Sequence, residues 1–352
     1  MSGQVTQAAT RVLPVAPALQ RLPLVTLYLT ERCNSRCVTC DYWRHGRADL
    51  NLDSVQRLLP QLLELRTRVA LISGGEPLLN PQWEPIARLL RDSGLTLYLL
   101  TSGLSLAKHA SRAAGLFDAI TVSLDGTDAA TYAAIRGLNA FDKVCEGIAM
   151  AVGEGVPVSL RVTVQRANYR QIPQFVELAR TLRACEVSFI AVDVANPHAF
   201  AREGDFSSEL ALAPADLPIL ERILCALESE HAADFESGLI AESPRRLRHI
   251  LRYFAAVCGQ GAYPPVRCNA PEFSAVISAR GQVSPCFFIP GPGASHWHNG
   301  LASALNGEPM TRLRGEIRAG ARPECARCVC SLWREPESRE VPDFLLRRKV
   351  HA

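Results

Sequence analysis

Strand-like and helix-like segments alternate from residue 24 to about residue 230, and this alternation constrains the fold more than any other feature. Six apolar runs predict strands, at Leu24–Thr30, Val69–Ser73, Thr96–Thr101, Ala119–Leu124, Val158–Gln165 and Glu186–Val194. Amphipathic segments predict helices, at Leu52–Leu65, Gln82–Arg91, Leu104–Ala114, Asp128–Val152, Gln171–Arg183 and Ala215–Ser229. Six such repeats predict an α/β fold with parallel strands, right-handed crossovers and functional side chains at the carboxyl ends of the strands.

Polar residues line one face of several predicted strands, which favours an open barrel. In the segment 158–165, Ser159, Arg161, Thr163 and Gln165 alternate with apolar residues, and the segments 24–30 and 119–124 alternate similarly. Closed barrels fill their interior with branched apolar side chains. A polar inner face therefore predicts a partial (β/α)6 TIM-like barrel that holds a ligand and water. Strands at an exposed sheet edge would show the same alternation.

The composition narrows the class of protein. The 352 residues suffice for one large domain and a smaller one. The net charge of +3 argues against broad nucleic-acid binding. The sequence contains no run of about 18 apolar residues, so no membrane span is predicted. The first twenty residues show no secretory signal. We therefore expect a cytoplasmic protein. Twelve cysteines in that compartment predict metal or redox chemistry rather than a disulfide framework.

Cys33, Cys37 and Cys40 follow the first predicted strand with the spacing Cys-x3-Cys-x2-Cys. Thiolates are soft ligands that suit zinc or iron–sulfur clusters. A closed zinc site uses four ligands, and no histidine stands at ligand spacing before His45. A four-iron cluster held by three cysteines would keep one iron without a protein ligand, and that iron could bind a small molecule; on spacing alone the triplet is one of several possible soft-metal sites. Three unrelated buried cysteines would need a coincidence of spacing and position.

Glycine and polar residues follow the second and fourth predicted strands. The candidate cofactor-binding residues there are Gly74, Gly75, Glu76, Pro77, Ser123 and Asp125. The two glycines allow the backbone to approach a ligand closely, and Glu76 or the neighbouring carbonyls can receive an ammonium group. A strand that ends in an Asp-Gly turn would also explain Asp125.

The cysteine triplet and the Gly74-Gly75-Glu76 turn together resemble the signature of the radical S-adenosylmethionine (radical SAM) superfamily. The resemblance implies that the 4Fe-4S cluster binds S-adenosylmethionine through its amino and carboxylate groups, that the turn contacts the amino group and that Ser123 and Asp125 contact ribose and carboxylate. It implies reductive cleavage to a 5′-deoxyadenosyl radical that abstracts a substrate hydrogen. A flavodoxin- or ferredoxin-type electron donor is implied as well.

Two residues depart from the family's pattern. Thr39 stands where many members carry an aromatic residue near the adenine, and Tyr42 or Trp43 could take over that packing. Ser102 replaces the asparagine of the family's Thr-Asn-Gly turn after the third strand, which weakens the expectation of a substrate contact there.

More cysteines gather in a region rich in Pro and Gly, around a predicted hairpin at 273–287. The set is Cys268, Cys286, Cys325 and Cys328. It resembles the Twitch domain, a shortened SPASM domain that binds one auxiliary 4Fe-4S cluster. Structural zinc would use four thiolates too. Cys258 and Cys330 flank the set and could replace a ligand.

These patterns predict an N-terminal extension (1–23), a radical SAM partial barrel (24–235), an auxiliary-cluster domain (236–335) and a tail (336–352). Arg161 and Asp193 at strand ends are the candidate substrate-contacting residues. Only about 23 residues precede the first strand, which favours a small-molecule substrate. A sugar, aminocyclitol or nucleoside intermediate would undergo oxidation, epimerisation or dehydration. A peptide- or protein-modifying maturase and a non-catalytic metal-binding module are the alternatives.

Overall fold

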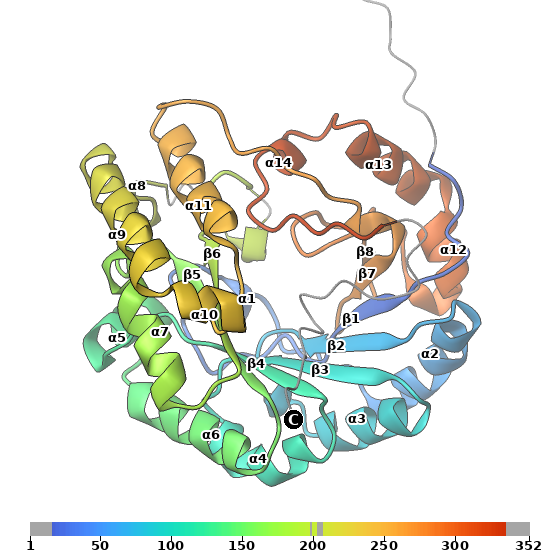
Figure 1. Cartoon of the computed structure of the whole chain (residues 1–352). Coiled ribbons are helices and arrows are strands. Elements are labelled where there is room, and N and C mark those ends of the chain that lie inside the picture. Colours follow the sequence, from blue (N-terminus) through green and yellow to red (C-terminus); the bar gives the residue numbers. More distant parts are fainter. Residues whose placement is uncertain (1–15, 198, 203–206, 336–352) are drawn as a thin grey trace, which may run out of the picture.

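The computed structural model describes residues 16–335 apart from residues 198 and 203–206, and it contains one curved sheet (Figure 1). The strand order is β6-β5-β4-β3-β2-β1-β7-β8. The strands are β1 (Leu24–Tyr28), β2 (Val69–Ser73), β3 (Thr96–Thr101), β4 (Ala119–Ser123), β5 (Val158–Val164), β6 (Glu186–Ala191), β7 (Ser274–Ile277) and β8 (Val283–Ser284). The first six run parallel in sequence order. The predicted α/β class and parallel six-stranded arrangement are confirmed.

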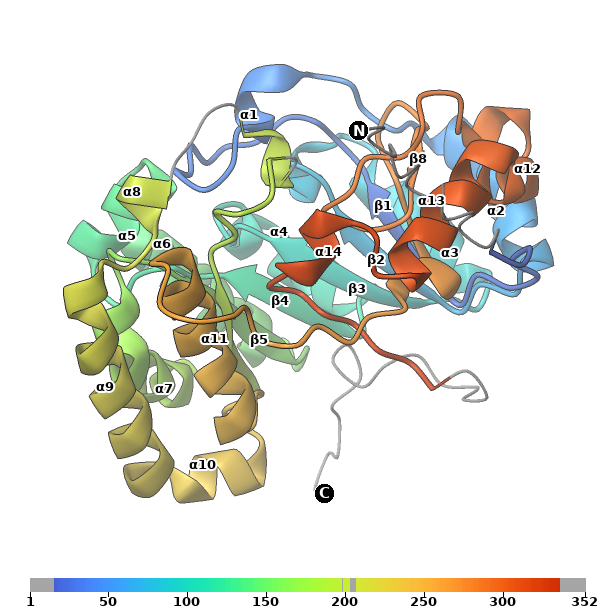
Figure 2. The ribbon, with the colours of Figure 1, turned by 90° about the horizontal axis from the view of Figure 1, so that it is seen from above.

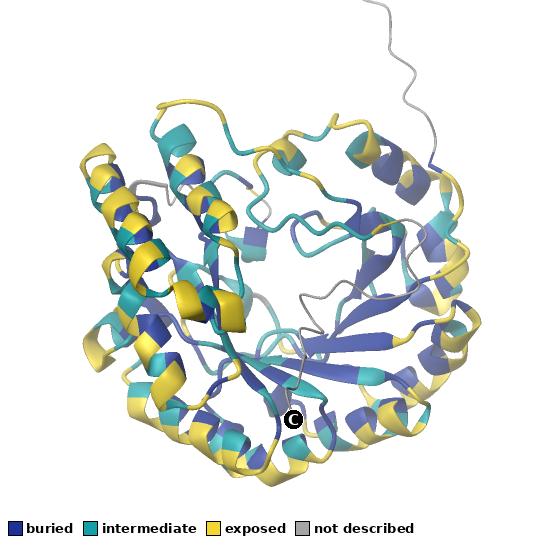
Figure 3. Ribbon diagram, viewed as in Figure 1, coloured by how far each residue is buried: buried dark blue, intermediate teal, exposed yellow. Residues whose placement is uncertain are grey.

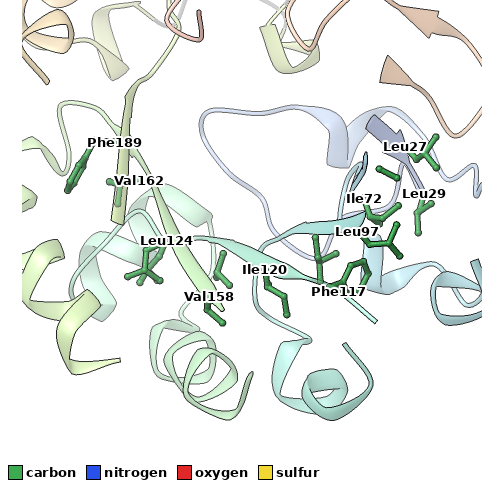
Figure 4. Packing of buried hydrophobic residues seen from close by; sticks show 14 of the residues in the cluster. Leu27, Leu29, Ile72, Leu97, Phe117, Ile120, Leu124, Val158, Val162 and Phe189 are labelled. Atoms are coloured by element: carbon green, nitrogen blue, oxygen red, sulfur yellow. The ribbon is translucent and has the colours of Figure 1, made fainter. Parts of the chain in front are cut away.

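Helices cover the outer, convex side of the sheet (Figure 1). They are α2 (Leu52–Glu64), α3 (Trp83–Asp92), α4 (Leu106–Ala114), α5 (Ala129–Arg136), α6 (Phe141–Gly153) and α7 (Ile172–Thr181). Strand residues such as Leu27, Ile72 and Ile120 are buried and point toward these helices (Figure 4). Burying each such side chain contributes about 1.5–3 kcal/mol. This apolar layer forms the main core and fixes where the strand ends lie.

The inner face of the sheet is polar in some strands and apolar in others. On β5, Leu160 and Val162 are fully buried toward the helices, whereas Arg161 and Thr163 are half-buried on the inner side. A second apolar cluster lies on the other face of β1–β3, opposite the main core. Its strand residues are joined by two residues that precede β7, and Leu332 packs on it. The cluster consists of Leu24, Val69, Leu71, Tyr98, Ala270 and Phe273. The polar inner face predicted for the first strand is thus limited, because the C-terminal segment covers part of it.

The segment 128–152, predicted as one helix, is divided into α5 and α6. Gly137 ends α5 in a left-handed conformation with φ 74°. Residues with a Cβ atom disfavour that conformation. The prediction missed this end because the apolar periodicity continues across the break.

The region after β6 adds elements at both ends of the sheet. They are α8 (Ser207–Leu210), α9 (Leu217–Glu230), α10 (Ala232–Ser237), α11 (Pro244–Val257), α12 (Leu301–Asn306), α13 (Glu308–Arg318) and α14 (Pro323–Ala326). Helix α11 packs on α9 and β6, while β7 pairs in parallel with β1 and antiparallel with β8. The predicted hairpin is therefore present and extends the barrel sheet. The predicted division at residue 235 stays a prediction.

The polar edge of β6 is covered, which limits its pairing with other chains. Glu242 accepts hydrogen bonds from the Ser188 hydroxyl (2.6 Å) and the Phe189 amide (2.8 Å).

Buried residues follow the sheet, and exposed ones lie on the outer helix faces (Figure 3). Within the described part of the chain, none of the helices has the length and apolar character needed to cross a membrane.

Candidate active site

The three N-terminal cysteines lie on a loop, residues 33–40, which we call the cysteine loop. All three side chains are half-buried and free of disulfides. Burial, and less strongly Cys37, raise the pKa of Cys33 to about 11; burial and the neighbouring thiols raise that of Cys40 to about 12. Metal ligation requires the thiolate form, so a metal that binds these thiols would release their protons.

The glycines of the Gly74-Gly75-Glu76 turn allow it to pack against the segment that leads into the cysteine loop. The Gly75 amide donates to the Thr30 carbonyl at 2.8 Å, and the Glu76 amide donates to the Arg32 carbonyl at 2.7 Å. A Cβ atom on Gly74 would lie 2.6 Å from the Thr30 oxygen, and one on Gly75 would lie 2.2 Å from the Arg32 oxygen. Any larger residue would push the turn away from Cys33.

The Glu76 carboxylate is fully buried and fully engaged within the protein. It accepts hydrogen bonds from the Thr101 hydroxyl (2.8 and 2.9 Å), from the Ser102 amide (2.7 Å) and from the Ser102 hydroxyl (2.6 Å). The Ser102 hydroxyl also lies 3.2 Å from Asn34 Oδ1 in the cysteine loop. Glu76 therefore joins the ends of β2 and β3 to the loop, with Ser102 as the connecting residue.

Arg136, which the sequence analysis did not single out, connects the cysteine loop to β4. Its guanidinium donates to Cys37 Sγ (3.2 Å) and to the Ser123 carbonyl (2.6 Å), and its Nε lies 3.0 Å from Asp125 Oδ2. Burial raises the pKa of Asp125, and Arg136 and the Thr163 amide oppose this rise. Arg136, and not the nearby Arg161, is the cation that pairs with Asp125 among the described ion pairs. The sequence Arg136-Gly137, a cation before a helix-ending glycine, was the available signal.

The end of α5 also holds the backbone of the cysteine loop. The amides of Arg36 and Val38 donate to the carbonyls of Arg136 and Ile135, both at 3.0 Å. A Cβ atom on Gly137 would lie 2.4 Å from the Arg36 oxygen. The left-handed glycine thus serves both to end the helix and to let the loop approach it.

The candidate substrate residues lie on the inner side of β5 and after β6. Arg161 is in register with Ser123 of β4 and Ser188 of β6, and among the described side chains no carboxylate pairs with it. Asp193 is buried; its Oδ1 accepts from the amides of Ala195 and Asn196, both at 3.0 Å, and its Oδ2 has no described partner. Burial raises the pKa of Asp193.

The C-terminal cysteines gather at the inner side of the sheet. Burial raises the pKa of Cys286 to about 12 and that of Cys325 to about 11, with the nearby Cys268 adding to both. Cys328 and Cys330 lie near Cys268 too, and burial raises the pKa of each. The charge of Arg161 opposes this rise for Cys330, so Cys330 also lies near Arg161.

Cys258 is separate from that set. Its thiol donates to the Leu212 carbonyl at 3.2 Å, and its charged neighbours are Asp216 and Arg166. Of the two flanking cysteines, only Cys330 lies beside the predicted ligands.

In the described ranges, no three His, Cys, Asp or Glu side chains are placed so that together they could hold one metal ion. The donor chemistry of the cysteine loop fits a four-iron cluster: three thiols stand on one loop, and hydrogen-bond donors from Ser35 (3.5 Å to Cys33 Sγ) and Arg136 face the sulfurs.

The fold and site together define an α/β protein with a cysteine loop at the carboxyl ends of parallel strands. Residues 27–179 match the Radical SAM superfamily. That family uses a 4Fe-4S cluster and S-adenosylmethionine, the pair predicted from the sequence.

Several curated proteins are similar to this chain. AdoMet-dependent heme synthase of Methanosarcina barkeri is 32% identical over 168 residues, 46% of this chain and 48% of the relative. GTP 3′,8-cyclase 1 of Mycobacterium tuberculosis (H37Rv) is 35% identical over 179 residues, 47% of this chain and 49% of the relative. The chain thus spans about half the length of these relatives.

Solved structures share the fold at low sequence identity. Streptococcus suis SuiB bound to its precursor peptide SuiA has a TM-score of 0.61 at 14% identity, covering 84% of this chain and 67% of SuiB. The anSMEcpe structure with bound AdoMet and a peptide has a TM-score of 0.62 at 18% identity, covering 88% of this chain and 86% of that one.

Proposed function

We propose that this protein is a radical SAM enzyme that abstracts hydrogen from a small molecule of the sugar, aminocyclitol or nucleoside type. Oxidation, epimerisation or dehydration would follow. The observation that carries the proposal is the attachment of the cysteine loop to the ends of β2, β3 and β4 through Glu76, Ser102 and Arg136. When bound, the 4Fe-4S cluster and S-adenosylmethionine together supply the 5′-deoxyadenosyl radical.

Cys33, Cys37 and Cys40 would hold the cluster, and the Gly74-Gly75 carbonyls would accept hydrogen bonds from the ammonium group of S-adenosylmethionine. Glu76 is less suited to that contact because Thr101 and Ser102 already bond its carboxylate. Its role is to position the turn. The half-buried Ser123 side chain would contact the ribose or carboxylate. Asp125 would act through Arg136, whose charge it balances.

Arg161 and Asp193 would orient the substrate beside the cofactor. Arg161 is in register with Ser123 on the neighbouring strand, about 5 Å away, so it would lie beside a cofactor that Ser123 contacts. Its guanidinium would bind a carboxylate, a phosphate or a sugar oxygen. Similarity to GTP cyclases favours the nucleoside class among the three substrate types.

The C-terminal set would hold an auxiliary 4Fe-4S cluster through Cys268, Cys286, Cys325 and Cys328. The mutual proximity of these thiols supports this assignment. A second redox group beside the substrate would suit a net oxidation. A cytoplasmic location and a flavodoxin- or ferredoxin-type donor belong to the same proposal.

The test is anaerobic reconstitution with iron and sulfide, followed by dithionite and S-adenosylmethionine. We expect 5′-deoxyadenosine and methionine by liquid chromatography and mass spectrometry. The Cys33→Ala/Cys37→Ala/Cys40→Ala variant should form neither. If the wild type holds iron at the cysteine loop but forms no 5′-deoxyadenosine, the protein is a non-catalytic metal-binding module and the proposal fails.

Peptide or protein maturation with the same chemistry is the second candidate. The fold likeness to SuiB, solved with a precursor peptide, favours it. Incubation of the reconstituted enzyme with metabolite extract, and separately with peptides encoded near its gene, would separate the two. Deuterium transfer from a labelled small molecule to 5′-deoxyadenosine supports the first candidate, and transfer from a peptide supports the second.

A further inference from the structure

A buried ion pair stands beside one sulfur of the cysteine loop. The Arg136 guanidinium donates to Cys37 Sγ at 3.2 Å, and its Nε lies 3.0 Å from Asp125 Oδ2. Among the described hydrogen bonds, the one to Cys37 is the only bond from a charged side chain to a sulfur of this loop. A cation and its counter-ion are therefore placed at one of the three predicted cluster ligands.

Hydrogen bonds to the sheet hold both charges of this pair in position. Asp125 Oδ1 accepts from the Thr163 amide of β5 at 2.7 Å, and Arg136 donates to the Ser123 carbonyl of β4 at 2.6 Å. Arg136 is also the last residue of α5, whose end holds the backbone of the loop. Neither charge can move away from the loop without breaking bonds to the ends of these strands.

The surroundings of the pair are shielded from water. Arg136 is 8% exposed and Asp125 is 2% exposed, and Tyr132, one turn earlier on α5, is fully buried. Charges interact far more strongly in such a region than in water. The effect of Arg136 extends beyond the sulfur that it contacts: burial raises the pKa of Cys33 and of Cys40, and the charge of Arg136 opposes this rise in both.

This cation acts on the cysteine loop rather than on the C-terminal cysteines. Helix α5 and helix α14, which carries Cys325, lie apart in both views of the ribbon (Figure 1 and Figure 2). Other cations act on the C-terminal set, Arg322 on Cys325 and both Arg161 and Arg246 on Cys330. A change at Arg136 should therefore affect one cysteine set alone.

The signs of the two charges determine what they do to a cluster at the loop. Reduction adds one negative charge to a cluster, so a nearby cation favours the reduced form and a nearby anion disfavours it. Hydrogen bonds to the ligand sulfurs also set the potential. Arg136 contacts the sulfur itself, whereas Asp125 contacts Arg136. The cation should therefore have the larger effect, and the anion should oppose it.

We propose that Arg136 and Asp125 set the reduction potential of the cluster at the cysteine loop, with Arg136 raising it and Asp125 limiting the rise. This inference rests on the proposed function, since it concerns the cluster of the same site. Both are positioning residues that act through Cys37. The pair determines how readily the cluster takes up the electron that cleavage of S-adenosylmethionine requires.

The test is a potentiometric titration of the reconstituted protein, followed by electron paramagnetic resonance in the absence of S-adenosylmethionine. The signal of the cysteine loop is the one that the Cys33→Ala/Cys37→Ala/Cys40→Ala variant lacks. We expect the potential to fall in Arg136→Met, which removes the cation and the donor, and to rise in Asp125→Asn, which removes the anion. Each shift should change the equilibrium constant for reduction about tenfold, or 59 mV for one electron.

The double variant Asp125→Asn/Arg136→Met keeps the proposal testable if a single variant does not fold. It leaves no buried charge without a partner, and replacing both members of a buried pair is tolerated far better than removing one. Its potential should lie between those of the two single variants. A potential outside that interval would contradict opposing effects of the two charges.

Asp118→Asn is the matched control, because Asp118 directly precedes β4 at the opposite end from Asp125, about 20 Å away along the strand, and pairs with Arg91. Its potential should equal that of the wild type. Equal potentials in Arg136→Met and the wild type would overturn the proposal. So would shifts of both single variants in the same direction, since a structural disturbance of the loop does not follow the sign of the charge. A wild type that holds the cluster but cleaves no S-adenosylmethionine refutes the proposed function instead, and the order of potentials is measured independently of it.

Discussion

Arg136 and Asp125 form a buried ion pair, with Arg136 Nε 3.0 Å from Asp125 Oδ2 and the side chains only 9% and 3% exposed. The same guanidinium contacts Cys37 Sγ. An aspartate at the end of β4 therefore sets the position of a cation beside a predicted cluster ligand. Hydrogen bonds and charges at the ligand sulfurs are known determinants of cluster potential.

Replacing Asp125 with Asn should leave the Arg136 guanidinium buried without its counter-ion. We expect the free energy of unfolding of the apoprotein to fall by about 3 kcal/mol, measured by urea unfolding with circular dichroism. Glu308→Gln, which breaks the exposed pair with Arg312, should cost less than about 1 kcal/mol. Equal losses in the two variants would contradict a special role for the buried pair.

Replacing Glu76 with Gln should weaken the binding of S-adenosylmethionine without removing the cluster. The amide NH2 would face the Ser102 amide or the Thr101 hydroxyl, so at least one acceptor would be lost and the turn would shift. We expect about a tenfold loss of affinity, since two disturbed hydrogen bonds cost about 1–2 kcal/mol. Calorimetry on the reconstituted protein measures it. The surface variant Glu84→Gln should bind as wild type, and iron content should not change in either.

Gly137→Ala should disturb the docking of the cysteine loop on α5. The new methyl group would lie 2.4 Å from the Arg36 carbonyl, and φ is 74°. Gly155→Ala is a matched control, because φ is 83° there but nothing lies within 4 Å. Both variants lose about 1 kcal/mol through the left-handed backbone. Only Gly137→Ala should also lose iron after reconstitution. Equal iron content would show that the loop tolerates the shift.

The C-terminal cysteines can be tested separately by iron analysis. In the Cys33→Ala/Cys37→Ala/Cys40→Ala background, about four irons per chain should remain if the second cluster forms. Adding Cys328→Ala should remove them, whereas adding Cys258→Ala should not, because the Cys258 thiol is bonded to Leu212 elsewhere. Zinc in place of iron in the triple variant would refute the auxiliary cluster.

Asp234 gives a pH dependence of stability. Its burial alone would raise its pKa, but hydrogen bonds from Arg180 and His231 lower it overall. A lowered folded-state pKa stabilises the fold above the unfolded pKa of about 4, and this contribution is lost as the pH falls through the folded value. Asp234→Asn should therefore destabilise the protein at pH 7, and the difference from wild type should shrink as the pH falls below about 4. A constant difference in urea unfolding across this range would exclude the mechanism.

The six parallel strands could be predicted because each is a short apolar run bounded by helix and turn signals. The observed strands end one to three residues earlier than predicted in four cases. The residues lost from those ends build the site instead: the carbonyl of Thr30 accepts the Gly75 amide, and Asp193 caps the turn after β6. A strand pattern alone cannot distinguish a last strand residue from a first site residue.

The sequence by itself determined the α/β class, the cysteine loop and the turn that packs beside it, because spacing along the chain is enough to specify a loop and its neighbouring strand. Only the tertiary structure decided which charged side chains contact each other or a cysteine sulfur. Arg136 is 99 residues from Cys37 along the chain, and Arg280 is 249 residues from Glu31. Such pairs depend on how helices and hairpin pack on the sheet, and local periodicity carries no information about that packing. The tertiary structure therefore also decided that Arg136 is buried with Asp125, whereas Arg161 stays half-buried on the inner face of the sheet.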